Sequence, residues 1–423
     1  MQPKPLLEAA TELVHRVLAF DQPADRVAAD FFRSQHALGA RDRHLLAESV
    51  FALLRRLAYF RHLAASGKGE PARRLAILAW QGNAGVLRAA LDDAERAWLE
   101  RAQAVDLGSL SDSLRHNLPA WLAEPLQAQL GPEFRPWAAS IDAPAPLDLR
   151  VNVAKADREE VLGLLRAEGL EAEATPYSPV GIRVVGKPAL QKLDLFTRGL
   201  VEVQDEGSQL LALLLDAKRG EMVVDFCAGA GGKTLAIGAT MRNTGRLYAF
   251  DTSAHRLDAL KPRLARSQLS NVHPAAIAHE RDDRVKRLAG KIDRVLVDAP
   301  CSGLGTLRRN PDLKWRQSPQ SVVEMTAKQA AILQSAARLV KSGGRLVYAT
   351  CSVLPEENEA IAEAFNLANP DFAPMDVAEV LEGLKVEGAG GLCTGGEGGT
   401  RYLRLWPHKH ATDGFFAAVW NRK

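Results

Sequence analysis

Long apolar runs are missing from this sequence of 423 residues. No stretch approaches the ~20 consecutive apolar residues of a membrane-spanning helix, so we expect no association with a membrane. The first residues, MQPKPLLEAATELVHRVLAF, contain acidic side chains and no small-residue cleavage site after an apolar core. They predict the first helix of a folded domain and not a signal peptide.

Cysteines are scarce, with four in the chain and no CxxC pair among them. That number and spacing exclude a disulfide scaffold and are typical of a cytoplasmic protein with reduced thiols. His408, His410 and Asp413 come close together near the end of the sequence, but no further cysteine or histidine nearby has the spacing of zinc ligands. We therefore expect no metal site.

A strong excess of one charge is also lacking, since the net charge is only +3. A charge this small does not by itself indicate nucleic acid. Basic side chains nevertheless gather in RDDRVKRLAGK (281–291) and around a tryptophan in LRRNPDLKWR (307–316). In the second cluster we predict contact with an RNA backbone and stacking on a base, with a solvated loop as the alternative. The residues concerned are Arg308, Arg309, Lys314, Trp315 and Arg316.

The hydrophobic pattern divides the chain into three regions. Residues 1–140 repeat apolar side chains at intervals of three and four, which predicts an all-helical domain of five to seven helices. Prolines in DAPAP mark a boundary, and residues 145–200 then show strand, helix and strand patterns in PLDLRVNV, ADREEVLGLLRAEGL and GIRVV. This small α/β unit is RRM-like, although it lacks the aromatic RNP signature.

Residues 201–423 contain four nearly continuous apolar runs, EMVVDFCA, RLYAFD, RVLVDAP and GRLVYATCS, separated by helical patterns. Such runs are typical of strands that are buried on both faces of a parallel sheet. We therefore predict an α/β fold with a doubly wound, Rossmann-like sheet. In such sheets ligands bind outside the carboxyl ends of the strands.

The first of these strands continues into the glycine-rich stretch FCAGAGGKT (226–234). Its GKT ending resembles a P-loop, but Cys227 stands where that motif needs its first glycine. The dinucleotide fingerprint G-x-G-x-x-G fails as well, because Thr234 occupies the place of its third glycine. What remains is a tight turn that brings backbone amides at a helix N-terminus close to a polar ligand.

The next strand ends in Asp251, whose carboxylate can accept hydrogen bonds from ribose hydroxyls. A glycine turn followed by such an acid suits S-adenosyl-L-methionine, a nucleoside cofactor that has no pyrophosphate. From these residues alone NAD remains the alternative, whereas an ATP site is excluded.

Two later strands are each followed by a cysteine, Cys301 in VLVDAPCSGLGTLRRNP and Cys351 in LVYATCSVLPEENE. A single cysteine of this kind is most often a small buried apolar residue. Two thiols at one crevice match the chemistry of methylating a pyrimidine at carbon 5. A thiolate adds to carbon 6 and makes carbon 5 nucleophilic, and a base afterwards removes the proton from carbon 5.

Four motifs, VQDEGSQL, DFCAGAGGKT, DAPCSGLGTLRRNPDLKW and ATCSVLPEENE, resemble the Fmu/Sun-type RNA cytosine-5 methyltransferases of the Nop/Sun family. The resemblance extends from about residue 145 to the closing segment LWPHKHATDGFF. In the helical region, GARDRHLLAESVFALLRRL resembles the NusB-like RNA-binding domain of the bacterial members that methylate 16S rRNA. The resemblance implies a class I methyltransferase domain, S-adenosyl-L-methionine as cofactor and an RNA substrate, foremost 16S rRNA.

The same resemblance implies roles for individual residues. Cys351 would be the nucleophile, Cys301 would remove the proton or release the product, and Asp298 would contact the target base and the cofactor. Asp251 would hold the ribose, and Asp282 would lie near the adenine, with Asp283 as its alternative. The residues lining the methionine and adenosine would be Cys227, Ala228, Gly229, Ala230, Gly231, Gly232 and Lys233.

We therefore expect a monomeric, cytoplasmic methyltransferase that acts on carbon 5 of cytidine in RNA. Transfer RNA is the nearest alternative substrate. A ribosome-assembly factor that binds RNA without catalysis is a second alternative, and the presence of both thiols argues against it. Methylation of an exocyclic amine is a third, and the DAPCS loop departs from the acidic or Asn-Pro-Pro-Tyr loop of such enzymes.

Overall fold

The chain folds into two compact units in the computed structural model. The residues described are 1–106, 108, 110–186, 188–395 and 399–423. One unit consists of Met1–Pro144 and Thr306–Pro319, and the other of Ala145–Gly305 and Gln320–Lys423. Residues 306–319, which include the second half of the motif DAPCSGLGTLRRNPDLKW, therefore belong to the N-terminal unit. Within the described ranges, no helix is both long and apolar enough to cross a membrane.

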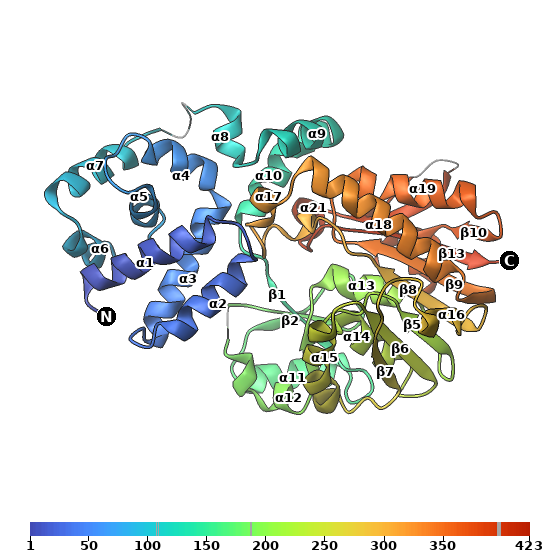
Figure 1. Cartoon of the computed structure of the whole chain (residues 1–423). Helices are drawn as coiled ribbons and strands as arrows, with labels where there is room; N and C mark the ends of the chain where they lie inside the picture. The colour runs from blue at the N-terminus through green and yellow to red at the C-terminus, as the bar shows by residue number, and fades with distance from the viewer. Residues whose placement is uncertain (107, 109, 187, 396–398) are drawn as a thin grey trace. The chain divides into compact units, whose positions relative to one another are not determined.

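The N-terminal unit is helical, as predicted, but its described residues up to Pro144 form ten α-helices where five to seven were expected (Figure 1). Their apolar faces meet in a core that includes the fully buried Leu7, Leu13, Phe31 and Leu46. The helices are α1 (Pro3–Val17), α2 (Ala24–Ser34), α3 (Ala40–Arg55), α4 (Leu57–Ala64), α5 (Pro71–Leu78), α6 (Ala84–Ala90), α7 (Asp93–Gln103), α8 (Asp112–His116), α9 (Ala120–Leu130) and α10 (Phe134–Asp142).

One stretch with continuous helical spacing forms two helices. The stretch RHLLAESVFALLRRLAYF keeps its helical spacing throughout, but Arg56 has φ −120° and ψ 34° and separates α3 from α4. The last carbonyl groups of a helix lack amide partners within that helix. The end of α3 therefore offers the carbonyl groups of Leu54 and Arg55 to donors from elsewhere in the chain.

Those donors come from the segment 306–319. The indole Nε1 of Trp315 donates a hydrogen bond of 2.8 Å to the carbonyl oxygen of Leu54, and Nζ of Lys314 donates one of 2.7 Å to that of Arg55. Both donors lie on the short helix α17 (Leu313–Arg316). A cation beside a helix C-terminus also interacts favourably with the helix dipole.

The prediction that 307–316 contacts RNA is wrong for the core of this segment. Lys314 is 2% exposed, and burial lowers the pKa of its ammonium group to about 8. Arg308 is buried as well, and Arg316 pairs with Asp312 at 3.3 Å. Composition alone is misleading here, because the donors that suit a phosphate also suit carbonyl groups inside a fold.

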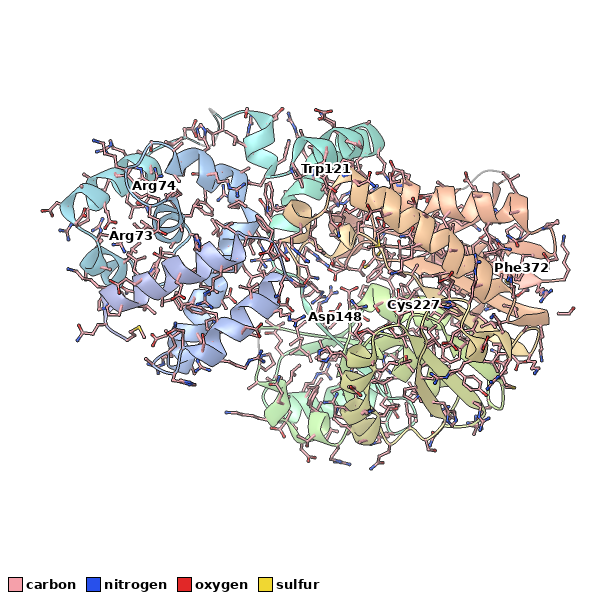
Figure 2. The ribbon with its side chains drawn as sticks, in the orientation of Figure 1. Arg73, Arg74, Trp121, Asp148, Cys227 and Phe372 are labelled. Carbon is pink, nitrogen blue, oxygen red and sulfur yellow. The ribbon has the colours of Figure 1, made fainter. Side chains whose placement is uncertain are left out.

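The second unit begins with a four-stranded antiparallel sheet in the order β2-β3-β1-β4. The elements are β1 (Leu147–Val151), α11 (Arg158–Ala167), β2 (Ala172–Ala174), β3 (Gly181–Val184) and β4 (Val201–Val203). Leu149 and Ile182 of the sheet and Val161 and Leu165 of α11 are fully buried in one core. Asp148, labelled in Figure 2, accepts hydrogen bonds of 2.8 and 3.0 Å from Arg183 through both carboxylate oxygens.

The remainder of the second unit is built on a nine-stranded sheet in the order β11-β12-β13-β9-β8-β5-β6-β7, with β10 also paired to β13. Strands β5 to β9 are paired in parallel, which confirms the Rossmann-like prediction. Strands β10 to β13 are antiparallel and were not predicted, so the sheet is mixed. The strands are β5 (Met222–Asp225), β6 (Arg246–Asp251), β7 (Val272–Ala276), β8 (Ile292–Asp298), β9 (Val340–Thr350), β10 (Phe372–Met375), β11 (Cys393–Gly395), β12 (Arg401–Leu405) and β13 (Phe415–Arg422).

The order of the strands creates a switch point between β5 and β8. From β5 the chain continues through α14 (Gly232–Thr240) to β6 and β7 on one side, and it then returns to β8 on the other side. In open α/β sheets, ligands bind outside the carboxyl ends of the strands at such a point. Asp225 and Asp298, the last residues of β5 and β8, mark this place.

Candidate active site at the carboxyl edge of the large sheet

The glycine turn between β5 and α14 depends on two glycines with positive φ. Gly231 has φ +84°, and a Cβ at this position would lie 2.1 Å from Cδ1 of Leu260. Gly229 has φ +56°, but a Cβ there would meet no atom within 4 Å. Gly231 is thus required by the packing of the turn, whereas Gly229 borders open space. Cys227, labelled in Figure 2, lies in the same turn and is partly buried, and its desolvation raises the pKa of its thiol well above the usual range.

Asp225 is a buried carboxylate that the sequence analysis did not single out. It is 1% exposed, and burial raises its pKa to about 7. Thr234 Oγ1 donates a hydrogen bond of 2.6 Å to Asp225 Oδ2, while Oδ1 has no hydrogen-bond partner among the residues that the structure describes. A buried acceptor without a partner is costly, so a ligand that donates a hydrogen bond here would be stabilised. The sequence signal for Asp225 was its position at the end of an apolar run, directly before the glycine turn.

Asp251 connects the glycine turn to the end of β6. Its Oδ2 accepts a hydrogen bond of 2.8 Å from the amide of Gly229, and its Oδ1 accepts one of 2.7 Å from the amide of Ser253. Each carboxylate oxygen has a second lone pair, so these bonds leave room for ribose hydroxyls. Asp251 therefore shapes the turn in addition to any contact with a ligand.

A second support for the turn comes from Arg263 on α15 (Ala254–Ser267). Its Nη1 donates a hydrogen bond of 2.7 Å to the carbonyl oxygen of Ala230, and its Nη2 lies 3.0 Å from Glu202 on β4. The arginine thereby links the turn to the small antiparallel sheet. No sequence motif indicated this contact, because it joins residues more than thirty positions apart.

The acids after β7 are Asp282 and Asp283, and the structure gives them different partners. Asp282 caps α16 (Asp283–Lys286) and accepts hydrogen bonds from the amides of Ala278 at 3.0 Å and Arg284 at 2.9 Å, which lower its pKa. Asp283 is exposed and pairs with Lys286 at 2.9 Å. The carboxylate of Asp282 is thus held in one orientation, whereas that of Asp283 faces solvent.

Lys233 and Asp298 form an ion pair across the switch point. Nζ of Lys233, at the start of α14, lies 2.7 Å from Oδ2 of Asp298, at the end of β8. Burial alone would lower the pKa of Lys233, but the charge and the hydrogen bond of Asp298 outweigh it and raise that pKa. The glycine turn and the DAPCS motif therefore meet at one point.

The two cysteines after β8 and β9 are in contact. Sγ of Cys301 lies 3.4 Å from Sγ of Cys351, although fifty residues separate them in the chain. The contact with Cys351, followed by burial, raises the pKa of the Cys301 thiol well above its usual range. The Cys301 thiol is therefore harder to deprotonate than a solvent-exposed cysteine.

His410, one of the polar side chains clustered near the C-terminus, has partners of its own in the fold. Nδ1 of His410 accepts a hydrogen bond of 2.9 Å from the amide of Trp406, and Nε2 lies 3.1 Å from the carbonyl oxygen of Gly391. In the part of the chain that the structure describes, no three His, Cys, Asp or Glu side chains are grouped in a way that could hold a metal ion.

Comparison with known proteins connects this site to one family. Residues 212–421 match the family model described as 16S rRNA methyltransferase RsmB/F, and residues 118–191 match the ferredoxin-like domain of RsmF/B-like methyltransferases. The second match begins within the helical unit and extends into the small antiparallel sheet. The two family models therefore account for most of the chain after residue 118.

Individual relatives agree with this result. The probable ribosomal RNA small subunit methyltransferase B of Synechocystis sp. is 36% identical over 343 residues, which are 80% of this chain and 74% of that protein. The ribosomal RNA small subunit methyltransferase B of Pasteurella multocida is 35% identical over 303 residues, 71% of this chain but only 64% of the relative. The crystal structure of PH0851 has a TM-score of 0.81 at 26% identity, with coverage of 100% of this chain and 99% of the other. The chain belongs to the RsmB/F family of 16S rRNA methyltransferases.

Proposed function

We propose that this protein transfers a methyl group from S-adenosyl-L-methionine to carbon 5 of a cytidine in 16S rRNA, with Cys351 as the covalent nucleophile. The observation that carries the proposal is the 3.4 Å contact between the thiols of Cys301 and Cys351 at the ends of neighbouring parallel strands. Carbon 5 chemistry needs both a nucleophile and a base, whereas methylation of an exocyclic amine needs no thiol. The names of the relatives support ribosomal RNA of the small subunit as the substrate.

The residues around the glycine turn fit the proposed cofactor. The open space beside Gly229 would admit it, and the free acceptor Oδ1 of Asp225 suits a hydrogen bond from its ammonium group. Asp251 has lone pairs left for the ribose hydroxyls. S-adenosyl-L-methionine supplies an electrophilic methyl group on a sulfonium sulfur. Besides Asp225, the residues that we assign to it are Cys227, Ala228, Gly229, Ala230, Gly231, Gly232, Lys233, Asp251, Asp282 and Asp298.

Cys351 begins the proposed reaction. Its thiolate adds to carbon 6 of the cytosine, the 5,6 double bond opens, and the freed electron pair makes carbon 5 nucleophilic enough to take up the methyl group. We assign Asp298 to the polar edge of the pyrimidine. Its ion pair with Lys233 holds the carboxylate in one orientation during this step.

Cys301 acts second in this proposal, as the base that removes the proton from carbon 5. The contact with Cys351 is the largest cause of the raised pKa of Cys301, and it is lost once the sulfur of Cys351 is bonded to carbon 6. In this proposal the Cys301 thiol then gives up its proton to solvent. The resulting thiolate accepts the proton from carbon 5, the double bond re-forms and Cys351 leaves as a thiolate.

The cofactor assignment predicts a selective gain in stability. S-adenosyl-L-methionine at 100 times its Kd is expected to raise the unfolding free energy by about 2.7 kcal/mol, and ATP is expected to have no effect because the turn lacks the P-loop glycine spacing. Gly229→Ala should lose this gain, because its methyl group would occupy the open space beside the turn. Thermal melts with and without each nucleotide measure the difference.

Gly220→Ala is the matched control for that variant. Gly220 has φ +80° and no atom within 4 Å of an added Cβ, but it lies in the loop before β5, at the opposite end of the strand. Both variants should therefore cost a similar backbone strain of about 1 kcal/mol, and only Gly229→Ala should lose the response to the cofactor. Equal protection by ATP, or an equal loss of response in both variants, contradicts the assigned site.

The substrate assignment predicts the loss of one methyl mark. Bisulfite sequencing of total RNA from a strain without this gene should show one 16S rRNA cytidine that is converted there but protected in the parent strain. Wild-type protein should restore the protection, and Cys351→Ala should not. A mark lost from transfer RNA would move the activity to that substrate, and an unchanged set of marks would favour the RNA-binding factor that lacks catalysis.

A further inference from the structure

Glu357 is a fully buried carboxylate in the second unit to which the proposed reaction gives no role. It is 0% exposed and lies at the end of the short 3-10 helix Pro355–Glu357, in the PEENE part of the motif that follows Cys351. A buried carboxylate is costly unless hydrogen bonds satisfy its oxygens. Its partners therefore indicate why the fold retains it.

Both oxygens of Glu357 accept two hydrogen bonds each. Oε1 accepts from the backbone amide of Ser302 at 2.8 Å and from Nε2 of Gln329 at 3.0 Å. Oε2 accepts from Oγ of Ser302 at 2.5 Å and from Oγ of Ser352. The two serine hydroxyls also lie 3.2 Å from each other. The carboxylate is thus surrounded by donors from two loops and one helix.

These donors come from the immediate neighbours of the two thiols. Ser302 follows Cys301 directly, and Ser352 follows Cys351 directly. Gln329, on α18 (Pro319–Ala337), also donates a hydrogen bond of 3.0 Å to the carbonyl oxygen of Pro300, the residue before Cys301. Glu357 therefore binds both cysteine loops at the residue next to each thiol.

The regular pairing of the two strands ends just before these loops. The pairing of β8 with β9 ends at Asp298 and Ala349, with one further hydrogen bond of 2.8 Å from the amide of Ala299 to the carbonyl oxygen of Ala349. Beyond this point the amide of Gly305 donates a bond of 2.8 Å to the carbonyl oxygen of Cys351. Glu357 and the two serines add ties between the loops at the residues next to the thiols.

We infer that Glu357 is a positioning residue that holds the Cys301 and Cys351 thiols in contact by binding the serine after each cysteine. This inference rests on the proposed function, in which the two thiols must reach neighbouring carbon atoms of one pyrimidine ring. A displacement of about 1 Å in such an arrangement can slow a reaction by about 100-fold. Glu357 itself does not need to touch the RNA or the cofactor.

The separation of the thiols can be measured without any catalysis. Dibromobimane becomes strongly fluorescent when it alkylates two neighbouring thiols, so its reaction with the full-length protein reports on the Cys301–Cys351 pair. Cys301→Ala and Cys351→Ala give the background from the other two cysteines. Glu357→Gln keeps the volume of the side chain but replaces one acceptor oxygen with a donor group, and its cross-linking rate should fall by about tenfold or more.

Two further variants complete the comparison. Glu356→Gln removes the same charge from the preceding residue, whose side chain is exposed, and it should cross-link at the wild-type rate. The double variant Ser302→Ala, Ser352→Ala removes the two hydroxyl donors and leaves the carboxylate in place, so it should reproduce the slow cross-linking of Glu357→Gln. If Glu357→Gln does not fold, this double variant carries the test.

The catalytic consequence is measured separately. In single-turnover experiments, Glu357→Gln should form the RNA adduct about 100-fold more slowly than wild type, while the affinity for S-adenosyl-L-methionine remains close to wild type. Wild-type cross-linking in both the Glu357→Gln and the double serine variant would overturn the inference, and so would slow cross-linking accompanied by an equal loss of cofactor affinity. If no variant ever forms an RNA adduct, the proposed function fails, and the cross-linking rates still decide the role of Glu357.

Discussion

The Cys301→Ala variant is expected to accumulate a covalent complex with its RNA in the presence of S-adenosyl-L-methionine. Cys351 can still add to carbon 6 and the methyl group can still be transferred, but no base then removes the proton from carbon 5. The adduct therefore cannot collapse. On a denaturing gel with labelled RNA, it should form a slowly migrating band that protease treatment removes.

Cys351→Ala should behave in the opposite way. Without the nucleophile, no adduct forms, and methylation should fall by about 10⁴-fold or more. The double variant should also lack the band. The two thiols touch each other at 3.4 Å, so a purely structural pair would respond alike to either substitution. A Cys301→Ala protein that is folded and cofactor-bound but forms no adduct would reverse this assignment of roles, and an active Cys351→Ala protein would exclude the covalent mechanism.

Trp315→Ala is expected to destabilise the helical unit by about 2–4 kcal/mol. Removal of a fully buried tryptophan side chain costs about 3–5 kcal/mol, and Trp315 is only partly buried against the helical core. The substitution also removes the hydrogen bond from its indole to the carbonyl oxygen of Leu54 at the end of α3. Hydrogen exchange of the amides in α3 should become faster, and chemical denaturation should show the loss of stability.

Arg41→Ala is the control. Arg41 is an exposed residue on α3, and its substitution should change the unfolding free energy by less than about 0.5 kcal/mol. The outcome also separates two roles for Trp315. If the indole stacked on an RNA base, the variant would keep its stability and lose about 1–3 kcal/mol of RNA affinity. Unchanged exchange in α3 together with weaker RNA binding would restore the prediction from the sequence.

The structure also affects how the helical unit can be tested for RNA binding. A truncation that removes residues 1–140 would take away the partners of both Lys314 and Trp315. It would therefore expose a buried lysine and an apolar ring within the segment that follows Cys301. Point substitutions on exposed helical residues are a cleaner test of RNA affinity than this deletion.

Much of the candidate site could be predicted because local sequence encodes it. The apolar runs defined β5, β6, β8 and β9, and the carboxyl ends of parallel strands meet at one edge of a sheet. Asp251 and Asp298 end two of those strands, and the two cysteines lie just after two of them, so their place at this edge followed from the pattern. The failed P-loop and dinucleotide spacings were likewise visible in FCAGAGGKT alone.

The contacts that hold these parts in place were not visible in the same way. Glu357 looked like one of several acids in PEENE, and only packing shows that it is fully buried between Ser302 and Ser352. Arg263 was one of several basic residues on an amphipathic helix until its bond to the carbonyl oxygen of Ala230 distinguished it. Partners of this kind are chosen by geometry in three dimensions, and no spacing in the chain records them.

By itself, the sequence determined the division into a helical and two α/β regions, the parallel strands of the large sheet and the chemistry at their ends. Periodicity is a local property, so strand ends, glycine turns and reactive thiols can be recognised from the sequence without knowing how the elements pack. Only the tertiary structure decided that residues 306–319 belong to the helical unit, where Lys314 binds a carbonyl group 259 positions earlier in the chain. The same basic residue in a sequence can lie on an RNA-binding surface or be buried at a helix C-terminus. Which of the two occurs depends on the elements that pack around it.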